Sequence, residues 1–152
     1  MAKMIRPFVL LFAMCLSSQS VGDNNRPRAN YMIHCQGCHL PEAVGFPGAV
    51  PRMKDFVGYF LHSTPGREFL IRVPGVSSSS LPDEEIAELV NWLLLTYSAE
   101  QLPEQFVPFT IDEVAALRTV PEMNPEVTRA YILENIADNV PSLARELAAV
   151  KQ

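Results

Sequence analysis

The sequence predicts an all-α fold, on three observations. Apolar residues between Asp83 and Tyr97 recur at the three- and four-residue spacing of a helix that buries one face. Thr110 to Glu113 has the form of a capping box, and Asn124-Pro125 is a second helix start signal. No stretch alternates apolar and polar residues for long enough to predict a sheet. Of the 152 residues 48% are apolar, which allows one domain of ordinary size plus an appendage.

Residues 1–22 have the layout of a secretion signal. Lys3 and Arg6 give a positive start, Phe8 to Leu16 is an unbroken apolar run, and small residues follow. The run is about half as long as a membrane span, which needs roughly 20 apolar residues. The alternative is a short buried or interfacial helix. The signal predicts export to the periplasm, a mature chain without a transmembrane span, and the loss of Cys15 on cleavage.

The charge balance is acidic. The chain has 12 basic and 17 acidic side chains, and the loss of Lys3 and Arg6 on cleavage would leave 10 basic side chains against 17 acidic ones. No basic stripe is present to neutralise phosphates, which argues against nucleic acid as a partner. An acidic surface favours a protein partner with a basic docking face.

The other segments are predicted to be short helices joined by loops that are rich in proline and glycine. Pro51 is placed to open a helix, and Ser63 to Gly66 is placed to stop it. Up to residue 100 we expect a short helix ending at 29–34, a loop at 40–50, a helix at 51–62 and a connecting segment at 67–80 that is flexible through its four serines. A linker at 101–109 then leads to helices at 110–118, 125–137 and 142–150. These boundaries predict a domain at 23–100 and a helical extension at 101–152.

One motif carries the predicted chemistry. Cys35-Gln36-Gly37-Cys38-His39 has the spacing of a c-type haem attachment site. Two thiols three residues apart on one turn can each add to a vinyl group at one edge of the porphyrin. His39 then gives an imidazole nitrogen to the iron, and Gly37 leaves room for the backbone beside the haem. The motif predicts one covalent haem c per chain, bound by Cys35, Cys38 and His39, with His39 as the metal ligand.

Two other chemistries use the same residue types. A thioredoxin-like dithiol would need a strand–helix–strand context, which this sequence of helices and loops does not offer. Zinc could be bound by His34, Cys35, Cys38 and His39, but these four residues crowd into one turn and cannot easily surround a tetrahedral ion.

Residues 28–97 resemble a class I cytochrome c domain. The resemblance rests on Tyr31 four residues before the first cysteine, on the Cys35–His39 motif, on the loop after it, and on the closing segment "VPGVSSSSLPDEEIAELVNWLL". It implies about three helices around one haem, with the first and last helices crossing at Tyr31 and Trp92. It also implies electron transfer through an exposed haem edge. It gives no expectation for residues 101–152.

The resemblance leaves the sixth iron ligand open. The family usually supplies a methionine on the loop before the closing helix, but no methionine occurs between Lys54 and Pro121. The candidates are Met53, His62 and Met123, or no protein ligand at all. The choice matters because a thioether raises the iron potential, whereas an open position admits small ligands.

Motif and resemblance together predict a periplasmic single-haem electron carrier. Its partner would be a redox protein such as a dehydrogenase or an oxidase, or the chain would be the cytochrome subunit of a dehydrogenase complex. The sequence offers no catalytic acid, base or nucleophile, so the chain is not predicted to be an enzyme by itself. The alternatives are a haem-based sensor or small-ligand binder, and a structural module whose extension binds another protein. Arg67 and Arg72 are candidates for neutralising haem propionates.

Overall fold

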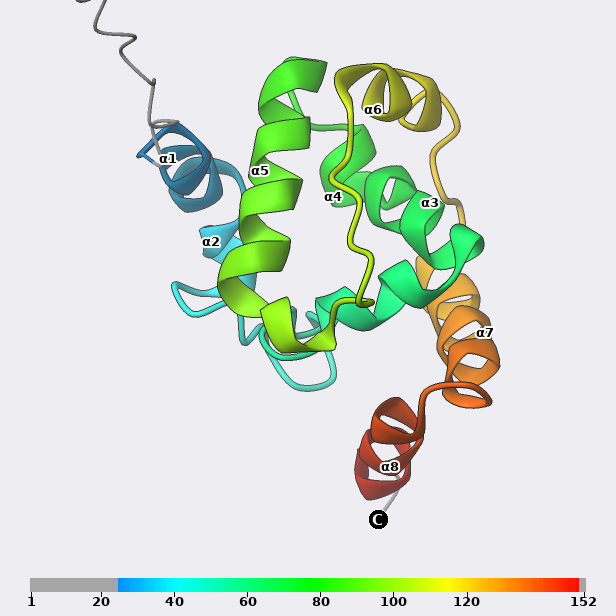
Figure 1. Ribbon diagram of the computed structural model, residues 1–152. Helices are drawn as coiled ribbons and strands as arrows, with labels where there is room; N and C mark the ends of the chain where they lie inside the picture. Colours follow the sequence, from blue (N-terminus) through cyan, green and yellow to red (C-terminus); the bar gives the residue numbers. More distant parts are fainter. Residues whose placement is uncertain (1–24, 151–152) are drawn as a thin grey trace, which may run out of the picture.

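The computed structural model describes residues 25–150, and its elements are helical, as the sequence predicts (Figure 1). One isolated bridge pairs Phe46 with Val50. No helix in this part of the chain is long and apolar enough to cross a membrane. The predicted secretion signal lies outside the described residues. The elements are α1 (Asn25–His34), α2 (Gln36–His39), the 3-10 helix η1 (Val57–His62), α3 (Thr64–Arg72), α4 (Pro74–Ser77), α5 (Asp83–Tyr97), the 3-10 helix η2 (Ala99–Gln101), α6 (Ile111–Leu117), α7 (Pro125–Ala137) and α8 (Pro141–Val150).

Helix α5 lies at the centre of the main core, and α1 packs against it. The apolar stripe of α5 is its buried face, and three carboxylates in its first turn stabilise the positive end of the helix dipole. Tyr31 of α1 is 1% exposed, and its ring centroid lies 5.8 Å from that of Trp92 and 5.5 Å from that of Tyr97. These contacts confirm the predicted crossing of the first and last helices.

The helix expected at 51–62 forms only over its second half. The amides of Met53 and Lys54 donate to the carbonyl of Ala43, and the amide of Asp55 donates to the carbonyl of Tyr97. Asp55 has a left-handed backbone, with φ 52°. These amides therefore donate to carbonyls of other segments and not to a preceding helical turn. The helical repeat begins only at Val57, as the 3-10 helix η1.

The prediction of a flexible connecting segment at 67–80 is wrong, because most of these residues are helical. Helix α3 covers Thr64–Arg72 and α4 covers Pro74–Ser77. Ser63 caps α3 by accepting a hydrogen bond from the amide of Gly66, and Pro65 lies in the first turn, where a proline costs no hydrogen bond. The residues that stop η1 are therefore also the start signal of α3.

The chain after η2 returns along α5 before α6 begins, and we call residues 102–110 the strap (Figure 1). Asn91 of α5 exchanges two hydrogen bonds with the backbone of Phe109. Its Nδ2 donates to the carbonyl at 2.9 Å, and the amide donates to its Oδ1 at 2.8 Å. The Phe109 ring and Val114 of α6 are buried in the main core, so the strap and α6 share the core of α1 and α5.

A second core joins α7 and α8 to η1 and α3. The guanidinium of Arg129 lies over the Phe56 ring at 5.1 Å, and Arg52 forms an ion pair with Glu146 of α8. In Figure 1, α7 and α8 lie on the opposite side of the molecule from α1. The buried members of this second core are Phe56, Tyr59, Phe60, Phe69, Ile132, Leu133, Ile136 and Leu143.

Candidate functional site

The three predicted attachment residues lie on one helical turn. The amides of Cys38 and His39 donate to the carbonyl of Cys35, at 3.1 Å and 2.9 Å. At positions i, i+3 and i+4 the three side chains share one face of the turn. Both thiols are free; Cys35 is half-buried and Cys38 is exposed. Two thioether bonds at one edge of a planar cofactor, with an imidazole beneath it, need this arrangement.

His39 is held as a neutral imidazole. Burial lowers its pKa, and the nearby carbonyl of Pro51 opposes that effect. The Nδ1 atom is buried and has no hydrogen-bond partner among the described residues. A neutral imidazole keeps a nitrogen lone pair, which is the form that binds a metal.

One side of this turn is open and the other is apolar. Gly37 is exposed, and a Cβ atom added there would meet no described atom within 4 Å, so nothing in the described chain obstructs this side of the turn. Cys35 packs against the main core, where burial raises the pKa of its thiol. The core that Cys35 packs against is apolar, and its members include Leu61, Leu70, Ile71, Val76, Leu81 and Phe106.

Two phenols fix the chain immediately after His39. Tyr31 Oη donates to the carbonyl of Leu40 at 2.6 Å, and Tyr97 Oη donates to the carbonyl of Pro41 at 2.8 Å. Burial raises the pKa of Tyr31 to about 12, so this phenol stays protonated and remains a donor. Leu40 itself has a left-handed backbone, with φ 64°. Helices α1 and α5 thus jointly set the direction in which the chain leaves His39.

The zinc alternative finds no support in this geometry. Within residues 25–150, no group of three or more His, Cys, Asp and Glu side chains is placed to hold a metal ion. His34 is exposed, at the end of α1.

The arginines predicted to meet propionates are engaged elsewhere. Arg67 forms a two-pronged pair with Glu113, at 2.6 Å and 2.7 Å, and also donates to the strap carbonyls of Val107 and Pro108. Arg72 donates to the carbonyl of Val120 at 2.9 Å. Both side chains therefore hold the helical extension.

The chain is similar to known proteins of Thermus thermophilus. One cytochrome c-552 of this organism is 32% identical over 136 aligned residues, which cover 78% of this chain and 87% of that protein. A second cytochrome c-552 of Thermus thermophilus is 34% identical over 108 residues, which cover 59% of this chain and 82% of that protein. No family model matches the chain.

The chain belongs to the class I c-type cytochromes. As a c-type cytochrome it carries covalently bound haem c, with its iron, and it is an electron-transfer protein rather than an enzyme. The helical architecture agrees with that family. The free thiols, the neutral imidazole and the open space beside Gly37 fit the cofactor that the family carries.

The cytochrome also has a polar contact that the sequence did not reveal. Arg118, from the end of α6, donates to the carbonyls of Ser79 and Leu81 and to the carboxylate of Asp83. This side chain holds the segment between α4 and α5, which the sequence predicted to be flexible. The sequence around Arg118 gives no local signal that this side chain binds the segment before α5, because its partners lie 35 or more residues away.

Proposed function

We propose that the chain is exported and works in the periplasm as a single-haem electron carrier. In this proposal residues 1–22 are a cleaved signal, 23–100 form the haem domain and 101–152 form a helical extension. Cys35 and Cys38 attach one haem c through thioether bonds, and His39 binds its iron. The observation that supports this assignment most directly is the single turn that places two free thiols and a neutral imidazole on one face.

The bound haem supplies one-electron chemistry, and the chain's own residues prepare the place for it. The two thiols hold the cofactor covalently, which keeps it in a small domain that buries little surface. His39 stays neutral because it is buried, so its lone pair remains available as the pH changes around neutrality. The apolar side chains of the main core, against which Cys35 packs, would offer the cofactor an apolar surface on that side.

The partner we propose is a redox protein with a basic docking face, such as a dehydrogenase or an oxidase. The chain is acidic, with 17 carboxylates against 12 basic side chains. Opposite charges would steer the two proteins together, and salt would weaken that attraction. The chain would act alone or as the cytochrome subunit of a dehydrogenase complex.

The experiment is mass spectrometry and a reduced pyridine spectrum of exported protein, with Cys38→Ala as the test variant. The wild type should have the mass of the mature polypeptide plus one haem. Cys38→Ala should lose a thioether bond, which shifts the pyridine spectrum and lowers the yield of haem-containing protein. Gln36→Ala, on the same turn but without a thiol, is the control and should keep both thioether bonds. A bare polypeptide mass in the wild type, or a full yield of normal haem protein from Cys38→Ala, would refute the assignment.

A further inference from the structure

The side chains able to bind iron opposite His39 are few, and the structure places nearly all of them away from the core. Imidazoles, thioethers, thiolates and phenolates are groups that proteins offer to haem iron, and the two described cysteines are the proposed attachment residues. Within residues 25–150, Met32 is 55% exposed and Met123 is 82% exposed. His62 lies at the end of η1, and its Nε2 lies 3.0 Å from the carbonyl of Gln101 in an exposed contact. The other three methionines lie in the proposed signal.

Met53 is the one thioether of the described residues that packs against the main core, but its backbone is anchored on the side of His39. Its amide donates at 2.8 Å to the carbonyl of Ala43, which is fully buried. The carbonyl of Pro51, two residues earlier, lies near the His39 imidazole. A planar ring separates its two faces, so a side chain that starts beside the first axial ligand cannot also serve the opposite face.

The phenols and the amine near the site are already bound to other groups. Tyr31 and Tyr97 donate to the carbonyls of Leu40 and Pro41, and burial raises the pKa of both phenols. Lys54 pairs with Glu42 at 3.2 Å. The other side chains that pack in or against the main core, as Cys35 does, are hydrocarbon or aromatic, as in Leu61, Leu70, Ile71, Val76, Leu81, Trp92 and Phe106.

We propose that this chain leaves the iron position opposite His39 without a protein ligand, as a binding site for small neutral diatomic molecules of the carbon monoxide and nitric oxide class. The proposal rests on the haem attachment proposed above. Apolar walls favour neutral ligands because a buried anion would need partners that these side chains cannot supply. The polarity and access of the pocket facing the open position decide what a haem protein binds there.

The test uses the exported, haem-loaded protein and carbon monoxide as the probe. Visible spectra of the reduced wild type are recorded before and after carbon monoxide is added, next to Met53→Leu and His62→Gln. Leucine has nearly the volume of methionine but no sulfur, and glutamine keeps a polar side chain at position 62 without an imidazole. Met123→Leu is the matched control for an exposed methionine.

We expect a high-spin reduced wild type whose main absorption band shifts fully on addition of carbon monoxide. The oxidised protein should lack the long-wavelength band of a sulfur–iron bond, and all three variants should behave as the wild type does. A low-spin reduced spectrum that carbon monoxide does not change would overturn the proposal. A carbon monoxide response gained only in Met53→Leu or His62→Gln would overturn it as well, and would name the ligand. These outcomes differ from a missing covalent haem, which would overturn the proposed function itself.

Discussion

Arg67 shows how much one side chain organises at the residue scale. Its guanidinium lies 4.0 Å from the centroid of the Phe109 ring, forms the pair with Glu113, and donates to two strap carbonyls. The flat guanidinium can meet a carboxylate and an aromatic face at once, which a lysine cannot do. Arg67 thus joins α3, the strap and α6. The hydrogen bond from Arg67 is also the main reason why the pKa of Glu113 is lowered.

This lowered pKa predicts a pH dependence of stability. Glu113 binds its proton less readily in the folded protein than in the unfolded chain, so its contribution is complete above its ordinary pKa of 4.5 and is lost as the pH falls below it. Glu113→Gln should therefore flatten the fall of the thermal unfolding midpoint as the pH is lowered through this range. Glu104→Gln, at an exposed position of the strap, should keep the wild-type slope. Equal slopes for the wild type and Glu113→Gln would contradict the prediction.

At the scale of elements, the segment between α4 and α5 depends on the extension. Arg118 approaches this segment from α6 and donates to Leu81 at 2.9 Å and to Asp83 at 2.7 Å. A second hydrogen bond joins the extension to the end of α3, where the amide of Glu122 donates to the carbonyl of Arg72 at 2.8 Å. The extension therefore supplies hydrogen-bond donors to carbonyls and a carboxylate of the proposed haem domain.

Replacing Arg118 tests this dependence. Arg118→Gln would leave several carbonyls and the Asp83 carboxylate without their donor, and should lower the free energy of unfolding by about 1.5–3 kcal/mol. Arg118→Lys keeps the charge but not the forked geometry, so it should recover only part of the loss. Denaturant unfolding of the haem-loaded protein measures both, with Arg145→Gln on the exposed face of α8 as the control. Limited proteolysis should cut Arg118→Gln faster between residues 77 and 82. A stability equal to that of the control would refute the role of Arg118.

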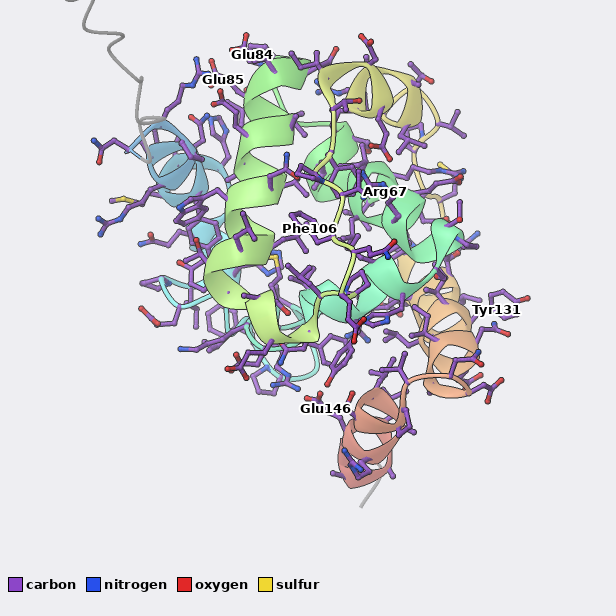
Figure 2. All side chains as sticks on the ribbon, viewed as in Figure 1. Arg67, Glu84, Glu85, Phe106, Tyr131 and Glu146 are labelled. Carbon is purple, nitrogen blue, oxygen red and sulfur yellow. The ribbon has the colours of Figure 1, made fainter. Side chains whose placement is uncertain are left out.

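On the scale of the whole molecule, the chain has two cores that share η1 and α3. The main core packs against Cys35 of the Cys35–His39 turn, and the second core lies under α7 and α8. Helix α7 covers the aromatic side chains of Phe60 and Phe69, which stack with ring centroids 5.3 Å apart. Its outer face carries Tyr131, which is 67% exposed and points away from the body (Figure 2). The extension thus contributes buried side chains to both cores.

Truncation separates the contributions of these parts. Ending the chain after Glu100 removes the strap, Arg118 and α7 and exposes the aromatic side chains of the second core. The free energy of unfolding should fall by well over ~3 kcal/mol. Because whole domains are stable by only about 5–15 kcal/mol, this form should aggregate or lose most of its haem-loaded yield. Ending the chain after Val140 removes α8 with the buried Leu143 and should give an intermediate loss. Unfolding midpoints and size-exclusion profiles measure both, and a Glu100 truncation as stable as the full chain would contradict this view.

The sequence alone determined the features that depend on neighbours along the chain. The stripe from Asp83 to Tyr97 predicted α5 because burial of one helical face imposes that period. The Cys35–His39 motif predicted the haem chemistry because one turn of helix fixes the spacing of its three side chains. Tyr31 and Trp92 were correctly paired, although only through the resemblance to a known family.

Only the tertiary structure decided the features that depend on distant partners. The conformation of residues 77–83 follows from Arg118, more than 30 residues later, and Arg67 faces Glu113 rather than a cofactor because the strap brings the two together. The helix at 51–62 was shortened because the amides of Met53 and Asp55 bind carbonyls from other segments. A local pattern cannot contain these outcomes, since each depends on which groups the folded chain brings within hydrogen-bond distance.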